Sequence, residues 1–379
     1  MQGTWLDLPP GTRVVAAMSG GVDSSVAAAL LVERGLDVIG ITMKNFCYGD
    51  VPLENAAAAC CSLEAIEDAR QVARTLGFPH HVLDFEGPFR DAVMDPFVAE
   101  YAAGRTPNPC VRCNRYVRFP QLWHKARLLG AEAVVTGHYA RAVRVDGEIQ
   151  LHRPRDRAKD QTFYLWGLTP SLLERAAFPL GEMTKAEVRA RARELGLDVA
   201  EKAESQDICF IPDGDLRGFL ERYREERPDV AGAERFQPGP IRTAEGETIG
   251  EHPGSAFFTV GQRRGLALAG RAEPHYVVAI EKDNTVVVGT EDELASDGLV
   301  AEEVNWLGGA PSDGPFHAEV QIRYRSEPVR AEVTPLPDRA ARIAFDAPQR
   351  AVASGQSVVV YSDSQVLGGG TIARDTPRN

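Results

Sequence analysis

The sequence is poor in cysteine, methionine and tryptophan, and it contains no long hydrophobic run. Six cysteines in 379 residues are too few for a disulfide scaffold, so these thiols are expected to be buried, metal-binding or reactive. No apolar stretch approaches the ~20 residues that a membrane helix requires. Residues 1–11 have neither the basic start nor the apolar core of a signal peptide. We therefore expect a cytoplasmic protein with no membrane partner.

Net positive charge is also lacking, because the formal charge at pH 7 is −12. A nucleic acid responds to the local charge of a surface more than to the total charge of the protein. Basic side chains gather in residues 105–118, 141–159 and 323–325. Both a solvated surface and an RNA-binding face fit such clusters, so the composition neither indicates nor excludes RNA.

The pattern of the first half predicts an α/β domain. Short β-branched runs at 13–19, 37–43, 80–85 and 131–139 are separated by helical patterns at 24–35, 55–77, 88–103 and 119–129. This alternation predicts a doubly wound parallel sheet whose ligands bind beyond the carboxyl ends of the strands. A hairpin is predicted around Asp146–Gly147, and a capping box at Thr184 and Glu187.

After about residue 208 the pattern changes to short β-type runs separated by glycine, proline and aspartate. One hairpin turn is predicted at Asp283–Asn284. Strands at this spacing predict one or two small β-barrels. We therefore predict three domains, which comprise residues 1–208, 209–285 and 286–379.

The string AMSGGVDSS, residues 17–25, lies where a predicted strand meets a predicted helix. Gly20 and Gly21 permit close backbone approach, and a helix N-terminus offers N–H groups to an anion. Asp23 would repel a bare phosphate, so it is either the helix cap or a ligand of phosphate-bound Mg²⁺. A plain capped turn is the alternative. A Walker A loop is excluded because no Gly-Lys-Ser/Thr follows.

The string NPCVRCN, residues 108–114, contains Cys110 and Cys113, and a further cysteine, Cys209, lies in ICFI. The Cys-x-x-Cys spacing fits half of a metal site, a redox pair or a sulfur-handling site. Zinc is disfavoured because no second Cys-x-x-Cys or His pair has metal-finger spacing. Arg112 and Arg115 would favour a nucleophilic thiolate at Cys113, whereas Cys209 alone fits a buried core position. The prolines predict a rigid loop.

The string SGGVDS resembles the pyrophosphate loop of the ATP pyrophosphatase superfamily, whose members transfer AMP to an oxygen of the substrate. The following strings, in this order over roughly residues 12–372, resemble the bacterial tRNA-specific 2-thiouridylases: MSGGVDSSV, GITMKNF, RTPNPCVRCNRYVRF, VVTGHYAR, KDQTFYLW, ESQDICFIP, TVGQRRGL, QIRYR and SGQSVVVY. The resemblance implies an adenine nucleotide alpha hydrolase-like N-terminal domain, a small central β domain and a C-terminal β-barrel that binds tRNA.

The resemblance also implies a reaction on the wobble uridine of the tRNAs for Lys, Glu and Gln. ATP, with Mg²⁺, would adenylate the oxygen on carbon 2 of the base. A sulfur carrier protein or a cysteine desulfurase would load Cys209 with a persulfide, and Cys113 would resolve it, in one version as a Cys113–Cys209 disulfide. That disulfide requires Cα atoms within about 7 Å, and a reductant must then reset the pair.

Residue roles follow from the same resemblance. Those implied to contact ATP are Ala17, Met18, Ser19, Gly20, Gly21, Val22, Asp23, Ser24, Met43 and Gly137. Those implied to contact the target base are Asn108, Pro109 and Cys110. Those implied to contact tRNA are His138, Lys159, Asp160, Gln161, Arg323, Tyr324 and Gln356. Without the resemblance, a structural histidine with satisfied hydrogen bonds is the better interpretation of His138.

One position departs from the family pattern. Many members carry an aspartate where this chain has Cys110, and an ordinary thiol, with a pKa of ~8.5, is mostly neutral where a carboxylate is charged. The proton-handling role of that acid is therefore in doubt. A further hypothesis is an iron–sulfur cluster held by three or four of Cys60, Cys61, Cys110, Cys113 and Cys209.

Two other functions compete with this interpretation. One is a different ATP pyrophosphatase, such as another tRNA thiolase or a small-molecule amidating ligase, which would not need Cys113, Cys209 and the β-rich tail. The other is a non-catalytic RNA-binding or metal-binding module. Such a module would not consume ATP, and the intact SGGVDSS loop argues against it.

Overall fold

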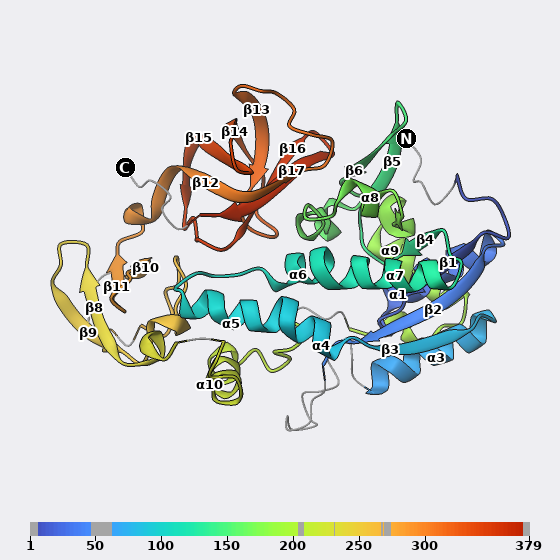
Figure 1. Cartoon of the computed structure of the whole chain (residues 1–379), viewed down its shortest axis with the longest axis horizontal. Helices are drawn as coiled ribbons and strands as arrows, with labels where there is room; N and C mark the ends of the chain where they lie inside the picture. Colours follow the sequence, from blue (N-terminus) through green and yellow to red (C-terminus); the bar gives the residue numbers. More distant parts are fainter. Residues whose placement is uncertain are drawn as a thin grey trace.

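The computed structural model describes residues 7–46, 63–203, 208–230, 232–266, 268 and 274–373. Its N-terminal part contains a five-stranded parallel sheet in the order β3-β2-β1-β4-β7, at the right of Figure 1. The strands are β1 (Arg13–Ala17), β2 (Asp37–Lys44), β3 (His80–Asp84), β4 (Ala133–Val135) and β7 (Ala176–Ala177). The doubly wound parallel sheet predicted from the sequence is thus confirmed.

Both faces of this sheet are buried, because neighbouring residues of a strand point to opposite sides. Val14 of β1 packs in one cluster with Leu31 of α1 (Val22–Glu33), whereas Val15 packs in another with Leu122 of α7 (Phe119–Leu128). Helices α3 (Leu63–Leu76) and α9 (Lys185–Glu194) pack against α1. The capping box predicted at Thr184 is present at the start of α9.

The segment of NPCVRCN is helical where the sequence predicts a loop. Helix α6 (Pro109–Arg112) continues through a π-helical segment, Cys113–Arg118, directly into α7. Pro109 occupies the first helical position, where its missing N–H and its fixed φ cause no loss. The loop prediction was therefore wrong. The segment predicted as one helix at 88–103 consists of α4 (Glu86–Phe89), a π-helical segment (Arg90–Met94) and α5 (Asp95–Ala102).

The C-terminal part forms a closed antiparallel barrel, coloured orange to red in Figure 1. Its strands are β12 (Ala295–Trp306), β13 (Phe316–Gln321), β14 (Val329–Leu336), β15 (Ala340–Arg350), β16 (Ser357–Ser362) and β17 (Gln365–Ile372). The sheet closes because β12 pairs with both β15 and β17. Alternate buried residues such as Val333, Ile343 and Val358 fill its interior. This confirms the predicted C-terminal barrel.

The predicted hairpin at Asp146–Gly147 joins the two parts. It comprises β5 (Arg141–Val145) and β6 (Glu148–His152), and both turn residues have positive φ, as a tight hairpin requires. Strand β6 pairs with β17 through His152 and Gln365, so the hairpin extends the sheet of the barrel. A short helix, α8 (Pro170–Leu173), follows nearby in the chain.

The stretch of chain between these parts forms a four-stranded sheet in the order β10-β11-β8-β9, at the left of Figure 1, which confirms the predicted central β domain. Its strands are β8 (Gly239–Thr243), β9 (Thr248–His252), β10 (Tyr276–Ile280) and β11 (Val286–Gly289). Asn284 has a positive φ in the predicted turn between β10 and β11. Helix α10 (Leu216–Glu226), which the sequence analysis did not predict, packs through Phe219 and Leu220 into the core of the N-terminal part.

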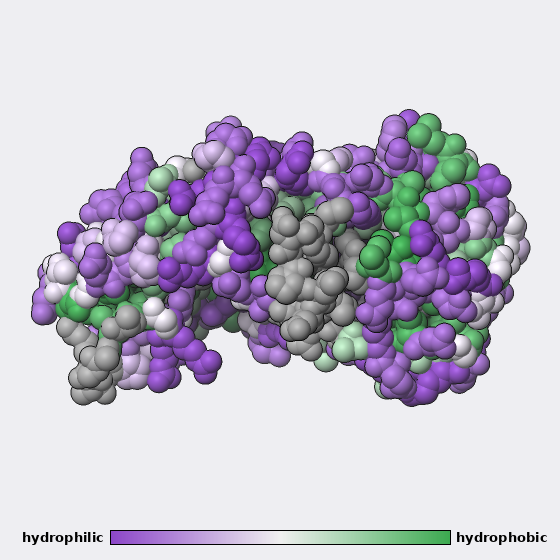
Figure 2. Space-filling model, turned by 90° about the horizontal axis from the view of Figure 1, so that it is seen from below, coloured by the Kyte–Doolittle hydropathy of each residue, from purple (hydrophilic) through white to green (hydrophobic). Residues whose placement is uncertain are grey.

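No helix within the described ranges is long and apolar enough to cross a membrane. The face of the molecule seen in Figure 2 is mostly hydrophilic. Exposed large apolar side chains are few among the residues the structure covers and lie apart in the chain, at Leu63, Tyr116 and Leu128.

Candidate active site

The predicted phosphate loop connects β1 to α1 and lies beside the loop that follows β4. This is the point where the order of the strands reverses, which is the usual ligand site of an open α/β sheet. Gly20 has φ +71°, and a Cβ added there would lie 2.0 Å from the backbone oxygen of Ala65. A Cβ on Gly137 would lie 2.7 Å from the backbone nitrogen of Ser24. Both glycines are therefore required by close backbone approach. Gly137 touches the loop, and its contact with ATP stays a prediction.

Hydroxyl groups hold the loop in shape from within. The backbone N–H of Ser19 donates to Ser24 Oγ at 3.2 Å, and Ser24 Oγ donates to the carbonyl oxygen of Gly21 at 3.0 Å. The N-cap of α1 is Gly21, and no side chain caps it. The first N–H groups of the helix are thus left for a ligand, and of the two roles predicted for Asp23 the helix cap is excluded.

The Asp23 carboxylate is instead the centre of a small polar cluster. Lys185 Nζ lies 2.7 and 2.8 Å from its two oxygens, and the hydroxyl of Tyr139 donates to Oδ1 at 2.9 Å. The Lys185 side chain is only 11% exposed. A Mg²⁺ ion that used Asp23 as a ligand would have to share its oxygens with this ammonium group.

Cys209 lies at the second position of a tight turn, closed by a hydrogen bond from Ile211 N to Ile208 O at 2.8 Å. The next residue, Phe210, is buried between the rings of Phe97 and Phe219, each with its centroid 5.2 Å away. The Phe210 side chain therefore anchors the turn, while Cys209 itself stays half-buried at the surface of the cluster.

Cys113, 7% exposed, belongs to the same hydrophobic cluster, which includes Met43 and is bordered by Ala17 and Cys209. The fold thus places at one hydrophobic cluster two cysteines that are 209 − 113 = 96 residues apart in the sequence. It also places them on the sheet face that leads to the phosphate loop. Cys113 is the first residue of a π-helical segment, a feature often found at functional sites.

Cys110 is exposed in the first turn of α6, which Asn108 caps by accepting a hydrogen bond from Val111 N at 3.3 Å. Burial is the main cause of a raised pKa of the Tyr164 phenol, and the nearby Cys110 and Tyr324 raise that pKa further. The rings of Tyr164 and Tyr324 are 4.5 Å apart. The structure therefore gathers the predicted base-contacting segment and Tyr324, a predicted tRNA contact, around Tyr164.

His138 faces inward at the end of β4. Its Nδ1 lies 2.8 Å from Thr136 Oγ1, and its Nε2 lies 3.4 Å from a nitrogen of Arg118. Because a guanidinium group can only donate, Nε2 is the acceptor and Nδ1 carries the proton. Burial and the charge of Arg118 lower the pKa of His138 to about 3, so the imidazole is neutral at physiological pH.

The predicted tRNA triplet, residues 159–161, follows the hairpin. The Asp160 carboxylate accepts hydrogen bonds from the N–H and hydroxyl of Thr162 at 2.9 and 2.6 Å and pairs with Arg153 at 3.0 Å. Gln161 Oε1 accepts a hydrogen bond from Tyr139 N at 2.9 Å. Lys159 is the last residue of a 3₁₀ turn. Two of the three side chains thus fix the backbone, and contact with tRNA stays a prediction for all three.

The barrel contributes the remaining predicted tRNA residues. Gln356 Nε2 donates to the carbonyl oxygens of Thr106 and Pro107 at 3.0 and 3.5 Å, so this side chain ties the barrel to the segment that leads into α6. Arg323 is exposed and donates to the carbonyl oxygen of Arg350 at 2.7 Å. Tyr324 packs on Tyr164, as described above.

Over the described ranges of the chain, no group of three or more His, Cys, Asp or Glu residues could hold a metal ion. Cys60 and Cys61, which the cluster hypothesis includes, lie outside those ranges. The iron–sulfur cluster is therefore not shown and stays a hypothesis.

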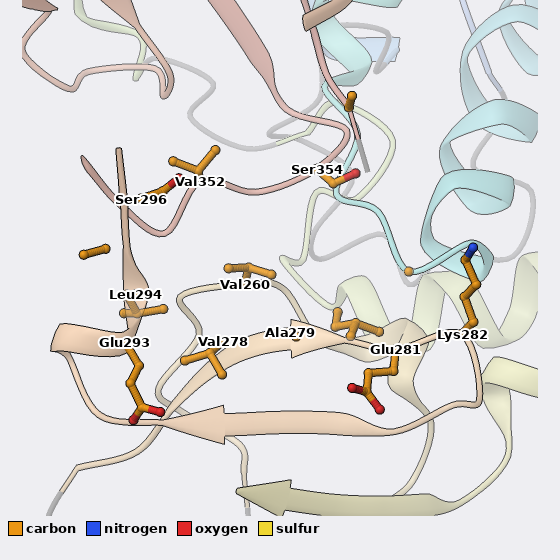
Figure 3. A pocket seen from close by; sticks show the side chains of 14 residues that line it. Val260, Val278, Ala279, Glu281, Lys282, Glu293, Leu294, Ser296, Val352 and Ser354 are labelled. Carbon is orange, nitrogen blue, oxygen red and sulfur yellow. The ribbon is translucent and has the colours of Figure 1, made fainter. Parts of the chain in front are cut away.

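A cavity of about 510 Å³ lies away from this chemistry, where the three parts of the chain meet. Figure 3 shows Val260 and Val278 of the central domain facing Leu294, Val352 and Ser354 of the C-terminal part, and Gly104 completes the wall. None of the predicted site residues lines it, so we interpret it as the junction of the parts rather than as the binding site of the base.

Three residues at the site were missed by the sequence analysis, namely Tyr139, Tyr164 and Lys185. Tyr139 and Tyr164 stand inside strings that were recognised, VVTGHYAR and KDQTFYLW, and Lys185 opens a helix that was predicted. The signal was thus present for the segments but not for the side chains, whose partners are distant in the sequence.

Family models match nearly all of the chain. Residues 12–213 match the tRNA methyl transferase HUP domain, residues 230–290 the tRNA methyl transferase PRC-barrel domain and residues 296–372 the aminomethyltransferase beta-barrel domain. A solved 4-thiouridine synthetase–RNA complex with bound ATP is similar over 58% of this chain and 51% of that chain, at 20% identity. The TM-score of that match is 0.36.

Curated relatives are much more similar. The tRNA-specific 2-thiouridylase MnmA of Heliobacterium modesticaldum is 49% identical over 96% of this chain and 92% of its own length. The proteins of the same name from Magnetococcus marinus and Carboxydothermus hydrogenoformans are 46% and 44% identical, over 95% and 97% of this chain and 98% and 100% of theirs. At this identity and coverage, the chain belongs to the tRNA-specific 2-thiouridylase family.

Proposed function

We propose that this protein is a tRNA-uridine 2-sulfurtransferase that uses ATP to convert the wobble uridine of the tRNAs for Lys, Glu and Gln into 2-thiouridine. The observation that carries the proposal is the shared cluster of Cys113 and Cys209, which Met43 and Ala17 connect to the phosphate loop. This arrangement supports an adenylation site next to a pair of cysteines that handle sulfur.

The first step uses the phosphate loop. ATP binds with its phosphates at the free N-terminus of α1, and the oxygen on carbon 2 of the uridine attacks the α-phosphate, which releases pyrophosphate and forms the adenylated base. Mg²⁺, when bound with the nucleotide, neutralises phosphate charge. Adenylation makes that oxygen a good leaving group, as the oxygen of AMP.

The second step uses the cysteines. The terminal sulfur of a Cys209 persulfide attacks carbon 2 and displaces AMP, which leaves the base attached to Cys209 through two sulfur atoms. The Cys113 thiolate then attacks the inner sulfur, so a Cys113–Cys209 disulfide forms and the base keeps the outer sulfur. In the alternative order, Cys113 attacks first and releases sulfide, which displaces AMP. Either order requires a dithiol to reduce the disulfide afterwards.

The persulfide of Cys209 requires a donor, which we propose to be a sulfur carrier protein or a cysteine desulfurase, in the cytoplasm. The turn at Ile208–Ile211 supports this assignment, because it leaves Cys209 half-buried rather than enclosed. The base would be extruded from its strand to reach the site. The Asn108–Cys110 segment and the Tyr164–Tyr324 pair supply hydrogen-bonding and stacking groups for it.

The test is reconstitution with unmodified tRNA, ATP, Mg²⁺ and a persulfide donor that carries radioactive sulfur. We expect label in the tRNA, 2-thiouridine by mass spectrometry of the nucleosides, and AMP in equal amount. The names of two matching family models suggest methyl transfer as the alternative. A methylated nucleoside formed from a methyl donor, without AMP and without sulfur, would contradict the proposal.

A further inference from the structure

Hydrogen bonds and one ion pair connect the phosphate loop to the segment that carries Lys159, Asp160 and Gln161. The Asp23 carboxylate is one end of this connection, because it contacts Tyr139 and Lys185 at 2.7–2.9 Å. Two separate routes lead from there to the segment. Each passes through a residue whose side chain touches the loop and whose backbone holds the segment.

The first route passes through Tyr139. Its hydroxyl donates to Asp23, its backbone N–H donates to Gln161 Oε1 at 2.9 Å, and its carbonyl oxygen accepts from Gln161 N at 3.1 Å. The residue is 2% exposed and packs in the core with Met18 and Val22 of the loop region. A close-packed side chain of this kind transmits a displacement because it has little free space around it.

The second route passes through Lys185, the first residue of α9. Its ammonium group pairs with Asp23, and its backbone N–H donates to Asp156 Oδ2 at 2.9 Å. The other oxygen of Asp156 accepts from Ala158 N at 3.2 Å and thereby caps the turn that ends at Lys159. The Lys185–Asp23 pair is largely shielded from solvent, so salt screens it weakly.

We propose that Tyr139 and Lys185 are positioning residues that couple nucleotide binding at the phosphate loop to tRNA binding at residues 159–161. The inference rests on the proposed function, because it takes ATP and tRNA as the two ligands. Nucleotide phosphates bring negative charge beside Asp23. The Lys185 ammonium group is then attracted both to the Asp23 carboxylate and to the phosphates. The position of Lys185, and with it Asp156 and the turn at Lys159, then depends on whether the nucleotide is bound. Such a coupling is reciprocal.

The test measures the dissociation constant of unmodified tRNA for the full-length protein, at fixed salt, with and without a saturating non-hydrolysable ATP analogue and Mg²⁺. Salt is held constant because phosphate contacts make tRNA affinity strongly salt-dependent. We expect the analogue to tighten tRNA binding by roughly fivefold or more in the wild-type protein. In Tyr139→Phe and in Lys185→Met this factor should fall toward one. The tRNA affinity without the analogue should change little, since neither side chain is placed against tRNA.

Two variants control for the loss of a similar contact elsewhere. Tyr223→Phe removes a hydroxyl that donates to the Asp95 carboxylate at 2.6 Å, and Lys202→Met removes an ammonium group paired with Asp68. Both should keep the wild-type coupling. The inference is overturned if wild-type tRNA affinity does not respond to the analogue, or if Tyr139→Phe and Lys185→Met respond fully. If the wild-type protein binds neither ATP analogue nor tRNA, the proposed function itself fails.

Discussion

The ring of Phe210 meets the ring of Phe97 nearly at a right angle, with centroids 5.2 Å apart, and this contact fixes the residue that follows Cys209. Edge-to-face pairs of this kind contribute specific packing beyond the area that they bury. Cys209, which we propose to carry the persulfide, therefore lies in a turn whose next side chain is part of the core.

Shortening this anchor should slow sulfur transfer more than adenylation. Phe210→Leu removes the aromatic contacts at a cost of roughly 1–2 kcal/mol in the free energy of unfolding. Release of pyrophosphate from ATP in a single turnover should be little changed, while the rate of 2-thiouridine formation should fall, since the turn holds Cys209 less firmly. The control is Phe258→Leu, which alters a buried ring in the central domain. If both variants slow sulfur transfer equally, the anchoring role of Phe210 is wrong.

A second prediction concerns the contact between the barrel and the segment before α6. Gln356→Ala removes two hydrogen bonds to Thr106 and Pro107, which should lower the free energy of unfolding by roughly 0.5–1.5 kcal/mol and weaken the use of tRNA. ATP affinity should not change. Gln349→Ala, which removes only a local contact to Ala347, is the matched control. An unchanged KM for tRNA in Gln356→Ala would contradict a role of this contact in tRNA binding.

A third prediction concerns His138 and the pH dependence of the stability of the folded protein. Its pKa in the folded protein is about 3, below the ~6.5 of an ordinary histidine, so between these values the unfolded chain binds a proton that the folded protein does not. The stability that this difference contributes is complete above pH ~6.5 and is lost as the pH falls toward 3. His138→Gln should therefore flatten the fall of Tm with acidification.

Part of the slope should survive in that variant, because burial also lowers the pKa of His80 and His152 to about 4. His81→Gln, at an exposed position, should reproduce the wild-type slope. A slope in His138→Gln as steep as that of the wild-type protein would mean that His138 does not titrate as described.

A fourth prediction concerns Cys110. Because this side chain is exposed in the first turn of a helix, Cys110→Asp should fold normally, and a carboxylate should be well accommodated near the positive end of the helix. We expect sulfur transfer at neutral pH to be at least as fast as in the wild-type protein, measured as 2-thiouridine per minute under saturating tRNA. A large loss would show that the thiol itself is required. A measurement of the iron content of the anaerobically purified protein would then test whether the cysteines hold an iron–sulfur cluster.

Much of the fold could be predicted because local patterns determine it. The alternation of strands and helices, the turn at Asp146–Gly147 and the capping box at Thr184 depend on neighbouring residues, and each is present. Helix α10 was missed although Leu216, Phe219, Leu220 and Tyr223 follow the spacing of a helical face. The loop predicted at Pro109 failed because proline is also favourable at the first position of a helix.

The site was predictable only through family motifs, which identify segments and not contacts. No local pattern indicates that Lys185 pairs with Asp23 or that Tyr164 packs on Tyr324, since these partners are 162 and 160 residues apart. Such contacts depend on how the sheet and the barrel are placed, which only the structure shows.

The most direct test of the proposed sulfur transfer follows the sulfur of a single persulfide from Cys209 to the tRNA. Wild-type protein is loaded with one radioactive persulfide sulfur, freed from the donor and mixed with ATP, Mg²⁺ and unmodified tRNA in one turnover. We expect the label to move from Cys209 to the tRNA, one AMP to appear for each sulfur transferred, and Cys209→Ser to carry no label to tRNA. Cys113→Ser should still release pyrophosphate but yield little free thiolated tRNA. Transfer of labelled sulfur by Cys209→Ser at the wild-type rate would show that Cys209 does not carry the persulfide.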